Sequence, residues 1–380
     1  MRRTDHPLEH QSLGRQTSIT SLHFGTPVAG AKKAYIQASL HAEELPGMLA
    51  AHHLRQLLEQ AEQQGRMTGE VVLVPVANPI GLAQRVDHKP MGRFDLDSSE
   101  NFNRNYPDLA SAVYDKVKGQ LGADAQRNVA LVRNAVRQHV LDWKPANALQ
   151  SLRKTLVTLA HDADLVLDLH CDCEAIVHLY VEVPCWPRLE PLASALGAQA
   201  VLLASNSGGV SFDECFSGLW WQLDQRLSAA ASPSDQARPL PQACASTTVE
   251  LRGESDVDHD LARADAAAIF GFLQHEGLIE GPPPTLPPAA CEATPLTGSQ
   301  TVKAPVAGVL VFLARPGDRL GRGDPVAEII DPISGATHKV TAEVDGVLYA
   351  RTSDRYVLPN DDLANIAGNV PFRTGNLLGA

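Results

Sequence analysis

The sequence predicts an α/β protein in which a layered domain, built on a mixed and largely parallel sheet, precedes a small all-β domain. Segments typical of strands alternate with segments typical of helices over roughly the first 280 residues. Runs that are apolar on both faces, such as EVVLVPVA and DLVLDL, are typical of strands buried in a parallel sheet. After a proline-rich stretch, short valine-rich runs separated by Gly, Pro and Asp turns predict an all-β module.

Each expected element follows from a local pattern. Alternating or wholly apolar runs predict strands at residues 32–39, 70–77, 164–169, 175–182 and 246–251. Apolar residues at helical spacing predict helices at residues 45–64, 109–141, 147–163, 190–198 and 257–276. We therefore expect a loosely ordered N-terminus (1–20), a large α/β domain (21–280), a proline-rich linker (281–300) and a small β domain (301–380).

The composition argues against several classes of protein. The 380 residues include 32 lysines and arginines and 44 aspartates and glutamates, a formal net charge of −12. We therefore expect no nucleic-acid partner and no anionic membrane partner. No apolar run reaches the ~18 residues of a membrane span, and the opening MRRTDHPLEHQ lacks the apolar stretch of a signal peptide. Six cysteines without a CxxC pair fit free thiols, so we expect a cytoplasmic protein.

Two segments supply side chains that can bind a metal ion. His41 and Glu44, in HAEE after the expected strand 32–39, are three residues apart at the start of a helix and project to one side. His170 follows the apolar strand 164–169, at the end where open α/β sheets place their sites. Taken alone, the His41–Glu44 spacing fits a chance pairing better than a metal site, and His170 alone fits a hydrogen-bonded core histidine better than a ligand. Together they provide three ligands and leave a fourth position for water, as in a catalytic zinc site.

Two further polar segments carry candidate functional residues. Glu250, in TTVELR, ends the expected strand 246–251 and is either a general base beside the metal or a solvated strand end. Asn103 and Arg104, in NFNRNYP, are adjacent donors that suit a carboxylate, which arginine can bind with two hydrogen bonds. A turn-rich loop explains this second segment equally well.

In this order, HAEE, NFNRNYP, DLH and TTVELR resemble the motifs of the zinc carboxypeptidase superfamily, in its succinylglutamate desuccinylase/aspartoacylase branch. The resemblance covers roughly residues 30–275 and implies a carboxypeptidase-like α/β/α catalytic domain with zinc as cofactor. The residues to which it assigns roles are His41, Glu44 and His170 for one zinc ion, Glu250 as the base that moves a proton from water to the leaving nitrogen, and Asn103 and Arg104 for a substrate carboxylate.

The resemblance also implies an arginine, upstream of the Asn-Arg pair, that stabilises the oxyanion. The segment RVDHKPMGR offers two, and we expect Arg85 to have this role, with Arg93 as the alternative. Asp168 is a candidate hydrogen-bond partner of the histidine two residues later, or a plain structural residue. We expect Cys171 and Cys173 to be buried structural thiols and not metal ligands.

Residues 301–350 resemble the small β domain of biotinyl and lipoyl carriers. A working carrier presents a lysine on the hairpin between its two halves, whereas the corresponding hairpin, 331–338, has none and Lys339 follows it. We therefore do not expect a carrier. In the branch named above, a C-terminal β domain packs beside the catalytic mouth and narrows it, which implies small acylated substrates.

The leading hypothesis is a zinc-dependent amide hydrolase that removes an acyl group from an N-acylated amino acid or related small amine. The main alternative is a metallocarboxypeptidase, and a non-catalytic zinc- or ligand-binding module is a third hypothesis. Peptidases of the superfamily place a tyrosine before the catalytic glutamate, and this chain has none between Tyr180 and Tyr349. We expect pocket walls from loops such as 203–222. The helical stretch 109–141 leaves a homo-oligomer open.

Overall fold

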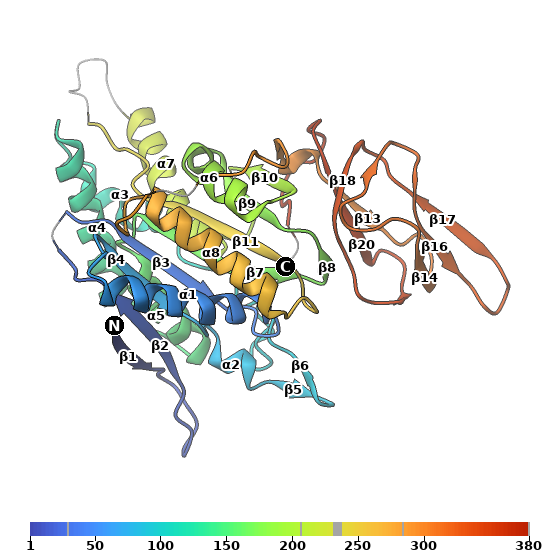
Figure 1. Ribbon diagram of the computed structural model, residues 1–380, viewed down its shortest axis with the longest axis horizontal. Coiled ribbons are helices and arrows are strands. Elements are labelled where there is room, and N and C mark those ends of the chain that lie inside the picture. Colours follow the sequence, from blue (N-terminus) through green and yellow to red (C-terminus); the bar gives the residue numbers. More distant parts are fainter. Residues whose placement is uncertain (29, 206, 231–237, 283–284, 379–380) are drawn as a thin grey trace.

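The computed structural model describes residues 1–28, 30–205, 207–230, 238–282 and 285–378. A nine-stranded sheet runs through the larger part of the molecule, and two antiparallel sheets stand to one side of it at the C-terminal end (Figure 1). The predicted fold class, a mostly parallel α/β layer structure with an added all-β part, is confirmed.

The large sheet is mixed. Its strands follow the order β1 (Arg2–Pro7), β2 (Ser18–Phe24), β4 (Glu70–Val74), β3 (Lys33–Ala38), β7 (Leu165–Asp172), β11 (Ala245–Gly253), β9 (His178–Glu182), β10 (Ala200–Ala204) and β12 (Ala293–Pro295). Strands β4, β3, β7 and β11 are parallel neighbours, whereas β9 runs antiparallel to β11. The carboxyl ends of β3, β7 and β11 therefore lie at one edge of the sheet, where such sheets bind ligands.

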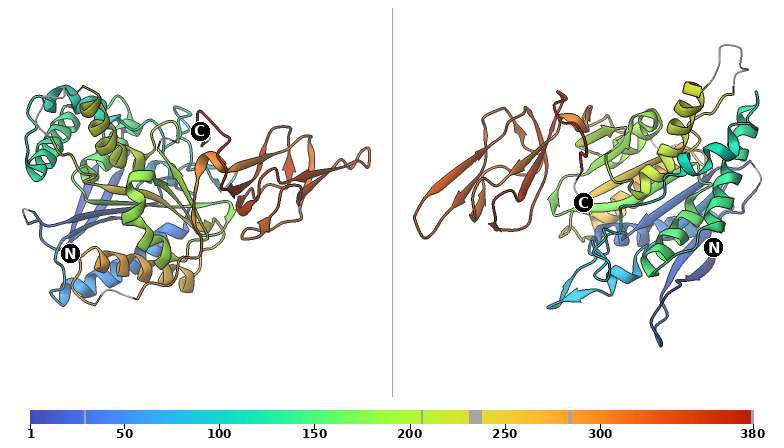
Figure 2. Two further views of the ribbon diagram at one scale, coloured as in Figure 1. Left: turned by 90° about the horizontal axis from the view of Figure 1, so that it is seen from above. Right: turned by 180° about the vertical axis from the view of Figure 1, so that it is seen from behind.

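Helices cover both faces of this sheet (Figure 2). One face carries α1 (Pro46–Gln63), α6 (Trp186–Leu196) and α8 (His259–His275), and the other carries α3 (Leu109–Val117), α4 (Ala125–Asp142), α5 (Ala148–Ala160) and α7 (Phe212–Ala230). In β7, Leu167 and Leu169 enter the core under the first group, and Val166 enters the core under the second. Because alternate strand residues share a face, Asp168 and His170 project toward α7 with Val166.

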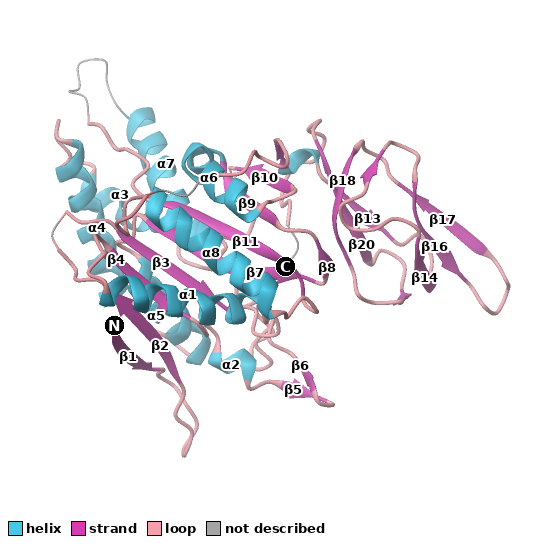
Figure 3. Cartoon of the chain, in the orientation of Figure 1, coloured by secondary structure: helices cyan, strands magenta, loops and turns pink. Residues whose placement is uncertain are grey.

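Residues 300–378, here called the C-terminal region, form two antiparallel sheets around a core of their own (Figure 3). One sheet has the order β13 (Gln300–Lys303), β20 (Asp362–Gly368), β18 (Gly346–Arg351), β15 (Arg319–Leu320), and the other β17 (Thr337–Thr341), β16 (Pro325–Ile330), β14 (Gly308–Phe312), β19 (Tyr356–Val357). Strand β8 (Glu174–Ala175), which follows β7, pairs with β18. Arg351 and Arg355 also form ion pairs with Glu174. The C-terminal region is therefore attached beside the end of β7.

The N-terminus differs from the expectation. Residues 1–20 were expected to be loosely ordered, but β1 pairs with β2 along its whole length and extends the large sheet. The side chains of β1 are mostly exposed, so its sequence carries no apolar alternation from which a strand could be predicted. In the expected linker 281–300, residues 283–284 lie outside the described part, and β12 adds a strand to the sheet edge beside β10.

Two other segments are more structured than the sequence indicated. The expected helix 109–141 is two helices, α3 and α4, because the glycine-containing turn at 119–122 interrupts it. The expected loop 203–222 contains the end of β10 and the first half of α7, and its Asn206 lies outside the described residues. The short helix α2 (Pro79–Leu82) leads into a hairpin of β5 (Arg85–Val86) and β6 (Lys89–Pro90). None of the helices that the structure describes is both long and apolar enough to cross a membrane.

Candidate metal and active site

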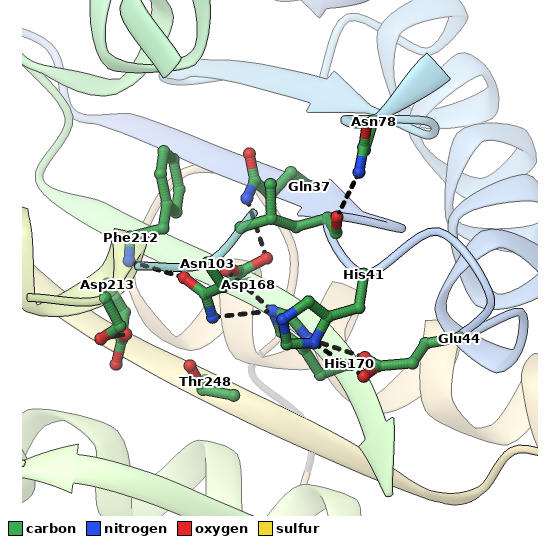
Figure 4. A network of polar contacts seen from close by, with 12 residues as sticks. Gln37, His41, Glu44, Asn78, Asn103, Asp168, His170, Phe212, Asp213 and Thr248 are labelled. Carbon is green, nitrogen blue, oxygen red and sulfur yellow. Dashed lines mark hydrogen bonds and ion pairs between the residues drawn. The ribbon is translucent and has the colours of Figure 1, made fainter. Parts of the chain in front are cut away.

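Three side chains meet at the carboxyl ends of β3 and β7. His41 and Glu44 lie in the turn between β3 and α1, and His170 lies near the end of β7, the neighbouring parallel strand. Their ligand atoms all lie within 4.8 Å of one another, and all three residues are buried. The structure thus brings together the three side chains that the sequence singled out as ligands (Figure 4).

Neighbouring oxygens fix the orientation of both imidazole rings. His41 Nε2 donates to Asn101 Oδ1 at 2.9 Å, and His170 Nε2 lies 3.0 Å from Oδ2 of Asp168. An amide oxygen and a carboxylate only accept hydrogen bonds, so these partners suit a ring that carries its proton on Nε2 and directs an unprotonated Nδ1 toward Glu44, as a metal ligand requires. The two Nδ1 atoms lie 2.8 Å and 2.7 Å from the two oxygens of Glu44. Two nitrogens and one carboxylate therefore converge, and this donor set fits a catalytic zinc ion.

A buried polar network holds these partners in place. Asp168 is fully buried, and its Oδ1 accepts a hydrogen bond from the Gln37 amide of β3 at 2.9 Å. Asn101 Oδ1 also accepts from the backbone N–H of Asn103 at 2.7 Å. Asn103 Oδ1 in turn accepts from the backbone N–H of Phe212, at the start of α7, at 2.8 Å (Figure 4). The network joins β3, β7 and α7 behind the metal ligands. Asp168 was predicted for this kind of role, whereas no pattern in the sequence distinguishes Asn101 from the other polar residues of its loop.

Glu250 lies beside His170 on the adjacent strand β11. The two residues are partners in the parallel register and so project to the same face of the sheet. Within the described structure, Glu250 Oε2 is buried and has no hydrogen-bond partner. Burial raises the pKa of Glu250 well above its usual range, and the charge of Glu44 adds to this shift. A carboxyl group with a raised pKa beside metal ligands is suited to proton transfer.

The structure separates the two candidate arginines. Arg85 lies in β5 of the exposed hairpin, and its guanidinium donates to the carbonyl oxygen of His88 in that hairpin. Arg93 lines the cavity in front of the ligands, and its Nη1 lies 3.3 Å from both His41 Nδ1 and Glu44 Oε1. Arg85, the arginine that we expected at the site, therefore lies outside it, because it belongs to the exposed β5–β6 hairpin. The chain reaches the cavity again at Arg93.

Asn103 and Arg104 face the cavity in different ways. Asn103 is buried, and its amide is engaged by Phe212 on one side and lies 3.4 Å from His170 Nε2 on the other. Arg104 is half-buried and lines the cavity, and its Nη1 donates to the Asn103 carbonyl at 2.8 Å. Of the two, Arg104 presents a charged group to the cavity, whereas Asn103 supports the protein framework.

The cavity in front of the metal ligands has a volume of about 300 Å³. The C-terminal region supplies part of its wall, namely Thr301, Tyr349, Asp362, Asn365, Arg373, Leu377 and Leu378. Tyr349 lies next to Tyr180 of β9, with their hydroxyl oxygens 3.5 Å apart. Tyrosines therefore reach the cavity from outside the segment that precedes Glu250, so the lack of a tyrosine in that segment does not by itself argue against a peptidase.

The two cysteines beside His170, Cys171 and Cys173, are free thiols. Cys171 is buried, and its backbone N–H donates to Glu44 Oε2 at 3.2 Å. Burial raises the pKa of Cys171 far above its usual range and that of Cys173 to about 11. In the described part of the chain, the one cluster arranged to hold a metal ion contains neither thiol.

Comparisons with known proteins agree with this architecture. The model of the succinylglutamate desuccinylase/aspartoacylase catalytic domain matches residues 30–128. A succinylglutamate desuccinylase/aspartoacylase family protein from Shewanella amazonensis is 25% identical, with a TM-score of 0.82 over 97% of this chain and 98% of that chain. One from Shewanella frigidimarina gives the same identity and TM-score, with 97% of each chain covered.

A more distant structure shares the fold alone. The succinylglutamate desuccinylase/aspartoacylase from Rhodobacter sphaeroides is 15% identical, with a TM-score of 0.65 over 97% of this chain and 96% of that chain. No curated protein sequence matches the chain. The predicted resemblance to the succinylglutamate desuccinylase/aspartoacylase family, whose members are deacylating hydrolases with a carboxypeptidase-like fold, is confirmed.

Proposed function

We propose that this protein is a zinc-dependent amide hydrolase that removes an acyl group from an N-acylated amino acid or related small amine. The observation that carries the proposal is the convergence of His41, Glu44 and His170 at the head of a cavity that Glu250 and Arg93 also face. When bound by the three ligands, zinc supplies Lewis acidity, which brings the pKa of water at its open position toward ~7.

Glu250 is the proton carrier in this proposal. Its buried carboxyl group stands next to His170 and has a raised pKa, so it is a stronger base than an exposed carboxylate. It accepts a proton from the attacking water and then delivers that proton to the nitrogen of the leaving amine. Its Oε2 has no hydrogen-bond partner in the described structure, so this oxygen is free to accept a hydrogen bond from water.

Arg93 and Arg104 stabilise charge on the substrate. Burial alone would lower the pKa of Arg93, but the charges of Glu44, Asp172 and Glu250 raise it, so the guanidinium stays protonated. Its position at the metal ligands suits a donor to the oxygen of the scissile carbonyl, where negative charge develops. Arg104 is the candidate partner of a substrate carboxylate, with Asn103 positioning it through the carbonyl that accepts from Nη1.

The cavity favours a small substrate over a peptide. A volume of about 300 Å³ is at the lower end of the range for small-molecule sites. The C-terminal region lines the cavity and limits the space available to a long chain.

The carboxypeptidase alternative gains support from Tyr180 and Tyr349, which face the same cavity.

A mass-spectrometric panel separates these functions. The zinc-loaded protein would be incubated with N-acetyl, N-succinyl and N-formyl amino acids, acetylated diamines and short peptides, with zinc content measured in the same sample. We expect hydrolysis of acylated small molecules. Release of C-terminal residues from peptides, without any from acylated amines, would replace the proposal with the carboxypeptidase. If a zinc-replete sample hydrolysed neither the acylated small molecules nor the peptides, both the amide hydrolase and the carboxypeptidase would be overturned.

A further inference from the structure

One wall of the cavity is apolar. Four of the residues that line the cavity also form, or pack against, a hydrophobic cluster between β10 and the C-terminal region, and they are here called the apolar wall: Ala204, Leu296, Leu377 and Leu378. They come from the end of β10, from the short helix η2 (Leu296–Gly298) and from residues 373–378, here called the tail. The proposed reaction uses none of these four side chains.

Hydrogen bonds hold the tail in place. The guanidinium of Arg373 donates to Ser299 Oγ at 3.1 Å and to the Leu377 carbonyl at 2.5 Å. The backbone N–H groups of Leu377 and Leu378 both donate to the Ser207 carbonyl, at 2.8 Å and 3.2 Å. Leu377 is 6% exposed, and Leu378 is half-buried. The two leucines therefore have fixed positions, and the apolar wall is formed before a ligand arrives.

A short glycine segment separates the tail from Arg104. A Cβ atom added to Gly208 would lie 2.7 Å from Asn376 Oδ1, so the tail packs directly against this glycine. A Cβ atom added to Gly209 would lie 3.1 Å from Arg104 Cδ, so the stem of Arg104 packs against the next residue. The apolar wall is therefore a close neighbour of the arginine that is the candidate partner of a substrate carboxylate.

We propose that the apolar wall binds the aliphatic side chain of an N-acylated amino acid whose carboxylate binds Arg104. The preferred substrates would then be N-acyl derivatives of amino acids such as norvaline or leucine. This inference rests on the proposed hydrolase function and names its substrate class. The carboxylate and the side chain of an amino acid share one α-carbon, so a carboxylate on Arg104 brings the side chain to the neighbouring wall. Each methylene that leaves water there should tighten binding about fourfold.

The same wall disfavours acidic amino acids. A side-chain carboxylate placed against Leu377 and Leu378 would lose its hydration without gaining a hydrogen bond from these side chains. Arg373 is the cation nearest in sequence, but two of its guanidinium nitrogens already donate to Ser299 and to the Leu377 carbonyl. We therefore expect aspartate and glutamate derivatives to bind less tightly than aliphatic ones of similar length.

Calorimetric binding of free amino acids, the amine products of the proposed reaction, tests the inference without requiring turnover. The zinc-loaded protein would be titrated with alanine, 2-aminobutanoate and norvaline, and with aspartate and glutamate. We expect Kd to fall about fourfold with each added methylene from alanine to norvaline. In Leu377→Ala and Leu378→Ala this gain should drop to about twofold or less per methylene, because the side chain loses apolar contacts. Leu378→Ala is the second variant because half-buried Leu378 tolerates substitution more readily.

Leu358→Ala is the matched control. Leu358 is a leucine of the C-terminal region that is 54% exposed and lies outside the cavity, so its variant should keep the full gain per methylene. Equal binding of alanine and norvaline would overturn the inference, and so would a gain that survives in both wall variants. Tighter binding of glutamate than of norvaline would also overturn it and would assign Arg373 to a side-chain carboxylate.

Failure of the proposed function gives a different result. If binding tightened with side-chain length but the mass-spectrometric panel showed no hydrolysis, the apolar wall would be sustained and the hydrolase refuted. If the panel showed hydrolysis but binding did not depend on side-chain length, the hydrolase would be sustained and the apolar wall refuted.

Discussion

The two ends of the cavity are built in different ways. The metal end combines residues that follow neighbouring strands β3, β7 and β11, together with one arginine from the loop after β6, namely His41, Glu44, His170, Glu250 and Arg93. Another wall of the cavity, formed by Glu182, Asp213 and Glu214, combines the end of the antiparallel strand β9 with the first turn of α7. The strands of the metal end are adjacent in the sheet, so its geometry follows from strand order. The position of this second wall depends on how a helix packs against the sheet.

The largest expected effect removes the metal end altogether. His41→Ala deletes one of three ligands, and we expect the purified variant to contain no stoichiometric zinc, because two protein ligands do not form a closed site. The zinc content per chain, measured by mass spectrometry after dialysis, tests this expectation. His52→Ala, which changes an exposed histidine of α1, serves as control and should retain one zinc per chain. Full zinc retention in His41→Ala would refute the ligand assignment.

A second change keeps the metal and stops the chemistry. Glu250→Gln preserves the shape of the side chain but cannot accept a proton, so kcat should fall by roughly 10²–10⁴-fold while zinc content stays the same. Steady-state kinetics on the best substrate of the panel, with zinc measured in parallel, provides the test. A variant with wild-type kcat would exclude Glu250 as the base.

A third test compares an arginine at the metal end with an arginine on the surface. Arg93→Ala should lower kcat by roughly 10²–10³-fold, as expected when a donor to the oxyanion is lost. Arg85→Ala changes an arginine of the exposed hairpin and should stay within about twofold of the wild type. The reverse order of effects would return the role to Arg85.

A smaller effect is expected behind the metal ligands. Asp168→Asn keeps the size of the side chain but removes the charge next to His170 Nε2, so zinc affinity should fall by about 10–100-fold. Competition with a chelator measures the affinity directly. Asp115→Asn, an exposed position of α3, is the control. Unchanged affinity in Asp168→Asn would reduce Asp168 to a packing role.

The smallest effect concerns the attachment of the C-terminal region. Burial raises the pKa of Glu174, but hydrogen bonds from Arg351 and Arg355 lower it by more, so the net shift is downward. A lowered pKa means that the ion pairs stabilise the fold above the ordinary glutamate pKa of about 4.3 and lose this contribution as the pH falls. Glu174→Gln should therefore lower the stability by about 1 kcal/mol at neutral pH.

The same variant gives a pH test. Between about pH 5 and pH 3, the wild type should lose more stability than Glu174→Gln, because the variant has no such ionisation to lose. Thermal unfolding at several pH values measures this difference. Parallel curves for the two proteins would show that Glu174 contributes nothing to the attachment.

The metal end was largely predictable from the sequence because its information is local. HAEE and DLH each follow an apolar run, and parallel strands bring their ends together. Arg85 and Arg93 could not be ranked in this way. Their placement depends on the β5–β6 hairpin, whose sequence, RVDHKP, carries no clear strand pattern. The sequence of a polar turn does not determine the path of the chain, so it could not show which of the two arginines faces the cavity.

The grouping of Glu182, Asp213 and Glu214 on one side of the cavity was not predictable, because these residues are not unusual in their own segments. Glu182 ends an ordinary strand, and Asp213 and Glu214 open a helix, where acidic residues are common for reasons of helix stability. Only the antiparallel placement of β9 beside β11, and the packing of α7 across both, bring the three carboxyl groups together. Such long-range contacts leave no local trace in the sequence.

The late position of the C-terminal region sets the order in which the parts of the cavity are synthesised. During synthesis on the ribosome, the three candidate metal ligands and Glu250 emerge more than a hundred residues before Arg373 and Leu377, which line the cavity from the C-terminal region. Leu377 is fixed there by its backbone N–H, which donates to the carbonyl of Ser207 at 2.8 Å. The residues of the candidate metal site are thus synthesised before the segment that completes this wall of the cavity, so the site stays open on that side until the C-terminal region has folded.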